Sequence, residues 1–215
     1  RLNSQYFCGT MIKLSRGGRN AYIVPRMKRM MNRTVWAMTK QLRKGSFKPE
    51  GYEVSFGSGK IDRIDTCETE DQVYVKILDY KTGAKSFDMA AFYHGLQMQL
   101  VVYMEEAVRL EERKHPGKKI VPAGIFYYRM KDPIVGKELD EKKLEEAILK
   151  ELRLDGIIRQ EDAVIQRLDA DFSGNSLVIP AGKTKSGYSK ASKMLLPEEF
   201  DAVLTYAQKR RTDLQ

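Results

Sequence analysis

The sequence predicts a mixed α/β fold, in which a central mixed β-sheet is flanked by helices. Three observations predict it: an amphipathic basic helix, then a run of three short alternating segments, then a second long amphipathic helix that leads into another apolar strand. This order is typical of one mixed sheet with helices packed on it. The 215 residues are enough for a single domain with a substantial core.

Apolar residues, many of them Met, recur at three- and four-residue spacings over residues 19–44, which predicts a helix with Arg and Lys between the apolar positions. This Met stripe favours plain core packing. Residues 52–56 alternate weakly and are expected to form a strand. Residues 60–66 and 73–80 alternate more clearly, and the polar turn between them predicts a β-hairpin.

A long amphipathic helix is expected over residues 88–113, where apolar residues again follow helical spacing. The elements expected after it are a strand over 120–128, a helix over 138–152, a short helix over 156–168, a strand with a basic loop over 177–190, and a helix opened by Pro197. The loop lysines suit either a DNA backbone or a solvated flexible segment, and both interpretations stay open; these are Lys183, Lys185, Lys190 and Lys193.

The formal net charge of +9 suggests a polyanionic partner such as DNA, although a solubilising surface would also explain it. The chain has no apolar run long enough for a transmembrane helix and no signal-peptide pattern at its start. Cys8 and Cys67 stand far apart, which fits free thiols in a reducing, cytoplasmic compartment. The first residue is not Met, so we expect a fragment of a longer subunit.

The hairpin carries the chemistry that the sequence predicts. Val73, Val75 and Ile77 share one face of its second strand, and Asp79 and Lys81 continue that face. A generic half-buried strand would not end its apolar face with a carboxylate and an ammonium, because buried charges need a partner or a metal.

Asp62 on the first strand lies opposite Asp79 if the hairpin is symmetric about Glu70 and Asp71. Two facing carboxylates repel one another unless a cation lies between them. Oxygen ligands of this kind suit Mg²⁺, with Mn²⁺ as a possible substitute. A salt bridge between Asp79 and Lys81 is the alternative explanation of the same spacing.

Gln99 lies at the edge of the apolar stripe of the helix after the hairpin, one turn before Tyr103. A glutamine on a buried face must find hydrogen-bond partners. A scissile phosphate or its attacking water could be one partner, and an ordinary core contact is the alternative.

Three motifs in this order resemble the RecB-type branch of the PD-(D/E)XK nucleases, and within it the AddB family of helicase–nuclease subunits. They are Gly-Lys-Ile-Asp-Arg-Ile-Asp (59–65), Ile-Leu-Asp-Tyr-Lys-Thr-Gly (77–83) and Gln-Met-Gln-Leu-Val-Val-Tyr (97–103). The likeness extends over residues 19–213. It implies a restriction-endonuclease-like fold and a single nuclease domain over residues 1–215, with a leading helix (19–45), a catalytic core (52–128) and a C-terminal mixed part (138–213).

By motif position, the resemblance implies that Asp62 and Asp79 bind a metal ion, with the backbone carbonyl of Tyr80 as a further ligand. It implies that Lys81 is the catalytic lysine and that Gln99 and Tyr103 lie beside the site. The implied reaction is hydrolysis of DNA phosphodiester bonds in recombinational repair of double-strand breaks, in a complex with the helicase–nuclease A subunit. A catalytically inactive DNA-binding or docking module is the alternative.

The sequence departs from the family pattern in three respects. Residues 57–59 join the first strand directly to the GxxDRxD motif, where family members have a longer stretch. The cysteines of the family's iron–sulfur cluster are missing, so we expect that cluster only in the full subunit. A histidine ligand upstream of the hairpin is also missing. Its place is taken by a carboxylate such as Glu50 or Glu53, or it is not needed, and His94 is expected to lie at a helix start near the site.

Overall fold

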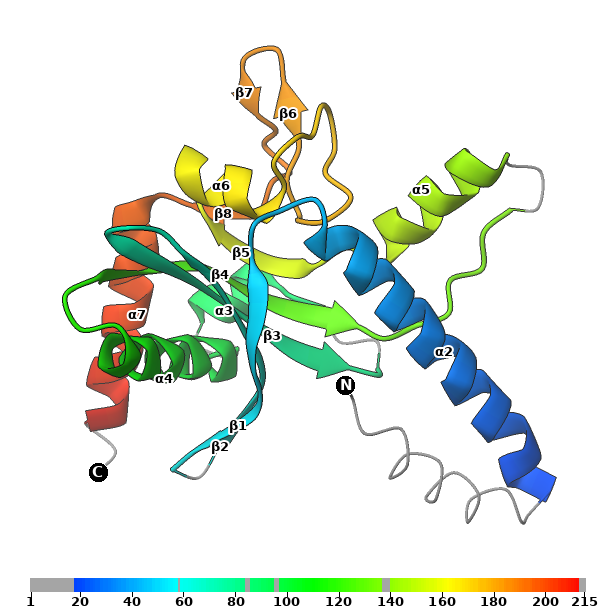
Figure 1. Cartoon of the computed structure of the whole chain (residues 1–215), viewed down its shortest axis with the longest axis horizontal. Helices are drawn as coiled ribbons and strands as arrows, with labels where there is room; N and C mark the ends of the chain where they lie inside the picture. Colours follow the sequence, from blue (N-terminus) through cyan, green and yellow to red (C-terminus); the bar gives the residue numbers. More distant parts are fainter. Residues whose placement is uncertain (1–17, 58, 84–85, 95–96, 137–139, 213–215) are drawn as a thin grey trace.

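The computed structural model describes residues 18–57, 59–83, 86–94, 97–136 and 140–212. Within these residues, six strands form one mixed sheet in the order β1-β2-β3-β4-β5-β8 (Figure 1). The first three strands form an antiparallel meander: β1 (Lys48–Phe56), β2 (Gly59–Glu68) and β3 (Gln72–Lys81). β4 (Lys119–Arg129) is parallel to β3, and β5 (Asp155–Arg159) is antiparallel to β4. β8 (Met194–Leu195) is parallel to β5 at the edge of the sheet. The predicted mixed α/β class is confirmed.

Each face of the sheet carries its own hydrophobic core, because successive side chains of a strand point to opposite faces. On β3, Ile77 therefore packs in one core and its neighbour Leu78 in the other. The Ile77 side is covered by α4 (Gln99–Lys114) and α7 (Pro197–Thr212). The Leu78 side is covered by α2 (Gly18–Leu42), α5 (Glu141–Glu151) and α6 (Asp162–Leu168) (Figure 1).

α2 confirms the predicted leading helix, but the predicted core role of its Met stripe is wrong for the N-terminal half. Ala37 is fully buried, whereas Met27 is 42% exposed and Tyr22 is 69% exposed. The helix is longer than the part of the sheet it covers, so its first turns project beyond the core (Figure 1).

The single helix expected over residues 88–113 is wrong, because the described chain forms two helices, α3 (Met89–Tyr93) and α4. Asp88 caps α3 by accepting a hydrogen bond of 2.8 Å from the N–H of Ala90. The amide of Gln97 then accepts from the N–H of Asp88 and donates to the carbonyl of Ser86, both at 3.3 Å. These bonds hold the chain in a corner, so the apolar stripe is continuous in sequence but not in one helix.

The predicted strand over 120–128 is confirmed by β4, and the predicted helices over 138–152 and from Pro197 are confirmed by α5 and α7 in the described residues. The segment 156–168 divides into β5 and α6, so a helix over its first part is wrong. Gly156 explains the difference: a Cβ there would lie 1.9 Å from the carbonyl oxygen of Ile125, and only glycine lets β5 pair so closely with β4. The apolar part of 177–190 is buried outside any strand, and its basic part forms a hairpin of β6 (Lys183–Thr184) and β7 (Gly187–Tyr188).

Candidate active site at a fork between two strands

β2 and β3 separate at the positions of the two predicted metal ligands. The ladder between them runs from Glu68 opposite Val73 to Arg63 opposite Leu78, which is the register symmetric about residues 70 and 71 that the sequence argument assumed. Beyond Arg63, β2 stays paired with β1 as far as Gly59 and follows it away from β3 (Figure 1). Asp62 and Asp79 are the next residues on the two strands, and they face each other where the fork opens.

The Asp62 carboxylate replaces a strand partner at the fork. Its Oδ2 accepts a hydrogen bond of 2.8 Å from the backbone N–H of Tyr80. The N–H and C=O of one strand residue point to the same edge, so the carbonyl of Tyr80 also faces the fork. Backbone groups of successive strand residues point to opposite edges. The carbonyl of the next residue, Lys81, points to the β4 side, where it accepts a hydrogen bond of 2.9 Å from the N–H of Met130.

Burial raises the pKa of the Asp62 carboxyl, and the negative charge of Asp79 raises it further. The N–H of Tyr80 and the charge of Lys81 oppose this shift, but the net direction is upward. The two carboxylates therefore repel one another across the fork, and a bound cation would relieve that repulsion.

Asp79 is buried, with 4% of its surface exposed, and its carboxylate forms an ion pair with the ammonium of Lys81. The Lys81 Nζ lies 5.4 Å from the ring centroid of Tyr127, which is the residue paired with Asp79 on β4. The salt bridge considered as the alternative is thus present. The contact holds the ammonium against the same carboxylate that lines the fork.

The Gln99 side chain donates a hydrogen bond of 2.6 Å to the hydroxyl of Tyr103, so the predicted i, i+4 pair exists. The expectation that Gln99 occupies a buried face is wrong: it is exposed, because α4 begins at this residue, and the buried glutamine is Gln97. The Tyr103 ring packs edge-on against Phe56 at the end of β1, 5.5 Å between centroids. The pair therefore lies next to the β1–β2 arm of the fork.

The donor atoms at the fork fit a hard divalent cation. Two carboxylates and a backbone carbonyl are oxygen ligands of the kind that Mg²⁺ takes, with water completing the shell. In the described part of the chain, no group of three or more His, Cys, Asp or Glu residues could hold a metal ion. Among the described residues, the oxygen atoms that the fork offers to a cation are therefore those of two side chains and the main chain.

Of the two glutamates considered as a replacement upstream ligand, Glu53 lies nearer the fork. Its negative charge contributes to raising the pKa of Asp62, and it forms an ion pair of 2.5 Å with Lys60. Glu50 instead pairs with Lys114 at the end of α4, at 3.3 Å.

The two histidines do not join the carboxylates. His94 is exposed and follows the last residue of α3, so it ends a helix where the sequence suggested a start. His115 lies at the other end of α4, 3.4 Å from Glu111. Cys67 is a buried free thiol, and Cys8 lies outside the described residues.

Sequence reasoning missed an ion cluster on the opposite face of the same two strands. Arg63 donates two hydrogen bonds to Asp65, at 2.5 and 2.7 Å, and the Lys76 ammonium lies 3.4 Å from the same carboxylate. Burial is the largest single influence on the pKa of Arg63 and lowers it, but the charge and hydrogen bonds of Asp65, together with Tyr80, outweigh it and raise the pKa overall. For Lys76 burial dominates and lowers the pKa. The DRxD motif therefore divides: Asp62 lines the fork, and Arg63 and Asp65 fix the register behind it. The alternation of side chains along this motif is the sequence pattern that could have revealed the division.

A second missed contact holds the segment that follows Lys81. The carboxylate of Asp155 accepts a hydrogen bond of 2.9 Å from the N–H of Phe87, and Lys193 donates one of 2.8 Å to the Phe87 carbonyl. Asp155 and Lys193 also pair with each other at 2.6 Å. Both polar groups of one backbone unit are thus bound by residues about 70 or more positions later, a separation that no local pattern reveals.

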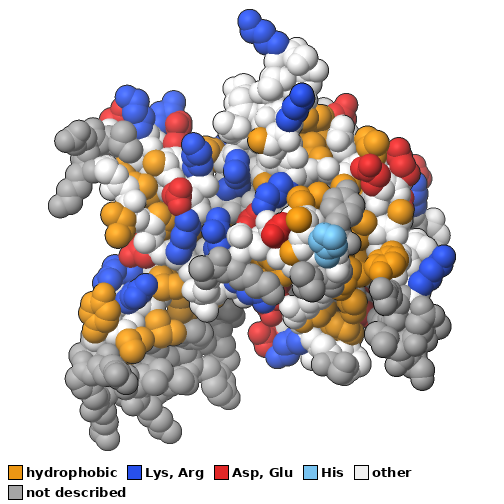
Figure 2. All heavy atoms as spheres, turned by 180° about the vertical axis from the view of Figure 1, so that it is seen from behind, with side chains coloured by type: hydrophobic (Ala, Val, Ile, Leu, Met, Phe, Trp, Pro, Cys, Tyr) orange, Lys and Arg blue, Asp and Glu red, His pale blue; other side chains and the backbone are white. Residues whose placement is uncertain are grey.

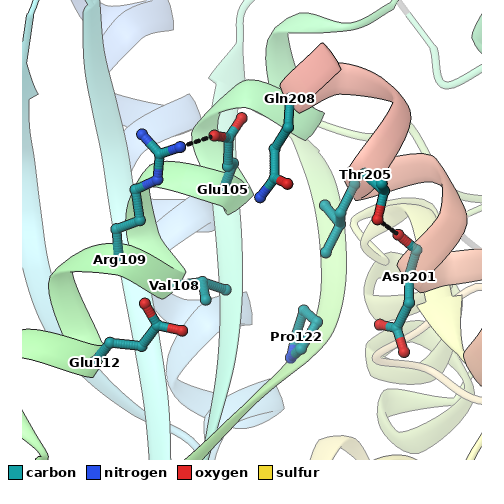
Figure 3. A pocket seen from close by; sticks show the side chains of 9 residues that line it. Glu105, Val108, Arg109, Glu112, Pro122, Asp201, Thr205 and Gln208 are labelled. Carbon is teal, nitrogen blue, oxygen red and sulfur yellow. Dashed lines mark hydrogen bonds and ion pairs between the residues drawn. The ribbon is translucent and has the colours of Figure 1, made fainter.

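A hollow of about 290 Å³ between α4, α7 and β4 is separate from the fork (Figure 3). Arg109 and Glu105 form an ion pair of 2.6 Å at one side, and Asp201 and Thr205 of α7 lie at the other. Its floor includes Pro122, five residues before Tyr127 on β4, which at about 3.3 Å per strand residue is roughly 16 Å from the fork. This hollow belongs to the docking of α7 on α4.

The mixed sheet, the fork with its two carboxylates and the lysine two residues after the second carboxylate define a nuclease of the PD-(D/E)XK class. The family model described as "PD-(D/E)XK nuclease superfamily" matches residues 7–185, and the chain belongs to this superfamily. Divalent metal ions are the cofactors that such nucleases typically use.

Curated relatives agree with this class, and each of the following is named as the B subunit of an ATP-dependent helicase/deoxyribonuclease. The chain is 35% identical over 212 residues to the protein of Alkaliphilus oremlandii, covering 88% of this chain and 18% of the relative. It is 37% identical to that of Alkaliphilus metalliredigens (89% and 18%) and 34% identical to that of Clostridium acetobutylicum (91% and 19%). The chain thus spans less than a fifth of these relatives. No helix in the described residues could cross a membrane.

Proposed function

We propose that this chain is the Mg²⁺-dependent deoxyribonuclease domain of AddB, the B subunit of an AddAB-type helicase–nuclease. It hydrolyses DNA phosphodiester bonds during recombinational repair of double-strand breaks, as an exonuclease when coupled to the helicase. The observation that carries the proposal is the fork, where Asp62 and Asp79 face one another and Lys81 lies beside them. The relatives named as deoxyribonuclease subunits support the same assignment.

In this proposal Asp62, Asp79 and the Tyr80 carbonyl hold the metal ion. When bound, a divalent cation supplies Lewis-acid activation of the phosphate and of a water molecule. The Lys81 ammonium stabilises negative charge that develops on the phosphate oxygens. Gln99 and Tyr103 hold the DNA strand beside the fork, because their exposed hydrogen-bonded pair offers a donor and an acceptor there.

The remaining context is proposed on the same grounds. The partners are DNA and the helicase–nuclease A subunit, the compartment is the cytoplasm, and residues 1–215 form one nuclease domain within a longer subunit. Since the motor that delivers DNA lies outside this chain, we expect the chain alone to turn over DNA far more slowly than the whole complex.

The test is degradation of labelled single- and double-stranded DNA with Mg²⁺ or Mn²⁺, comparing wild type with Asp79→Ala. Asp171→Ala, an exposed carboxylate on another part of the chain, is the matched control. We expect loss of cleavage in the first variant only, together with loss of Mn²⁺ binding by calorimetry in Asp62→Ala. Equal cleavage by wild type and Asp79→Ala would refute the assignment of the site. If the wild type binds DNA but neither cleaves it nor binds Mn²⁺, the docking module would be favoured.

A further inference from the structure

Residues 172–197 contain four lysines and no acidic residue, so every formal side-chain charge of this segment is positive. The β6–β7 hairpin lies in its middle and projects from the body of the molecule (Figure 1). Lys183, Lys185 and Lys190 are exposed on it. Such a projection has the charge that attracts a polyanion.

The hairpin is held in place by hydrogen bonds at its base, unlike a loose solvated loop. The N–H of Lys183 donates to the carbonyl of Gly174 at 2.6 Å, and the N–H of Ser189 donates to the carbonyl of Gly182 at 2.7 Å. The hydroxyl of Tyr188 donates to Asp162 of α6 at 2.8 Å. Lysines on a fixed frame lose less conformational entropy when they bind than lysines on a mobile loop.

Lys193, at the foot of the hairpin, connects it to the fork. Its ammonium binds Asp155 and the carbonyl of Phe87, in the segment that follows Lys81. Asp155 lies across β4 from Asp79, with Tyr127 between them.

At about 4.8 Å between neighbouring strands, Asp79 and Asp155 are roughly 10 Å apart along the sheet. Measured along the axis of a B-form duplex, this is about three base pairs of 3.4 Å each. From behind, Lys and Arg side chains are seen between the projecting hairpin and the middle of the face (Figure 2).

From these observations we propose that the β6–β7 hairpin binds the phosphate backbone of DNA a few nucleotides from the scissile bond and guides the strand to the fork. The contacts are Lys185 and Lys190, whose ammonium groups are exposed. Lys193 is a positioning residue, because its ammonium is occupied by Asp155 and Phe87. This inference rests on the proposed function only in taking DNA as the substrate.

The test measures binding of a labelled 20-nucleotide single strand by fluorescence anisotropy over a salt series, with Ca²⁺ in place of Mg²⁺ to prevent hydrolysis. The variant is Lys185→Gln/Lys190→Gln. The matched control, Arg113→Gln/Lys119→Gln, removes the same charge from exposed positions at the opposite end of the sheet. Each phosphate contact to a single strand contributes about 0.7 to the slope of log K against log salt, so we expect the hairpin variant to lower the slope by about 1.4.

A second readout separates this inference from the nuclease assignment. Thymidine 5′-p-nitrophenyl phosphate is too short to reach the hairpin, so the hairpin variant should hydrolyse it at the wild-type rate while degrading long DNA more slowly. An unchanged salt slope, or an equal fall in the control, would overturn the inference. A wild type that binds with the expected slopes but hydrolyses neither substrate would overturn the nuclease function and leave the hairpin's role standing.

Discussion

Replacing Asp65 with Asn should destabilise the fold strongly, although Asp65 lies only three residues from the proposed metal ligand Asp62. Asp65 has no exposed surface, and it balances the buried cations of Arg63 and Lys76. Removing one partner of a buried ion pair costs about 3–5 kcal/mol, because the remaining charge is left without compensation. The two hydrogen bonds from Arg63 lead to a similar figure, since bonds to charged groups are worth about 1.5–3 kcal/mol each.

The assay is urea unfolding followed by circular dichroism, with thermal unfolding in parallel. For a chain of this size, a loss of about 4 kcal/mol corresponds to a midpoint lower by roughly 10 °C. Asp62→Asn is the matched control: it keeps an acceptor for the Tyr80 N–H and removes the repulsion with Asp79, so it should abolish cleavage without loss of stability. Lys76→Met should restore part of the stability of Asp65→Asn. A loss under about 1 kcal/mol for Asp65→Asn, or an equal loss for Asp62→Asn, would refute this division of the motif.

Four further results are expected. Lys81→Gln should lower cleavage about a hundredfold or more at unchanged DNA affinity, measured by single-turnover kinetics, and an unaltered rate would contradict its role. Asp155→Asn should cost about 2 kcal/mol in urea unfolding, because the Phe87 segment loses a charged anchor. Gly156→Ala should cost about 3 kcal/mol, since its Cβ meets the β4 backbone. Burial and the bond to Asp162 raise the pKa of Tyr188 to about 12. The stability from that contact is therefore present below pH 10 and lost towards pH 12. Because Tyr80, Tyr127 and Tyr128 also have raised pKa values, Tyr188→Phe should remove one tyrosine from the late part of the titration followed by absorbance at 295 nm, and an unchanged titration would contradict the contact.

Local patterns were sufficient where they coincide with the tertiary contacts. The alternation of residues 60–66 and 73–80 predicted the hairpin. The symmetric register, which the sequence argument assumed, is the one that the structure has, and it places Asp62 opposite Asp79. Helical spacing predicted α2 and α5, and Pro197 predicted the start of α7.

The features that the sequence did not predict share one cause: each depends on a contact with residues that are not its immediate neighbours in the sequence. The break between α3 and α4 depends on Gln97 folding back on Ser86 and Asp88, and a helical stripe does not encode that return. β5 is a strand because Gly156 can approach β4 closely, whereas its apolar residues alone suit a helix equally well. The anchoring of Phe87 by Asp155 and Lys193 joins three separate parts of the chain.

The divergence of β2 from β3 has a consequence for how sequence signatures of this kind are interpreted. Where the ladder ends, the N–H of Tyr80 finds its acceptor in the Asp62 side chain. The same carboxylate is therefore both a proposed ligand and a substitute for the missing strand neighbour. Selection on folding alone would retain an acceptor at this position even in a descendant that no longer cuts DNA. Asn at position 62 would mark such a descendant, because it keeps the architectural acceptor and gives up the charge.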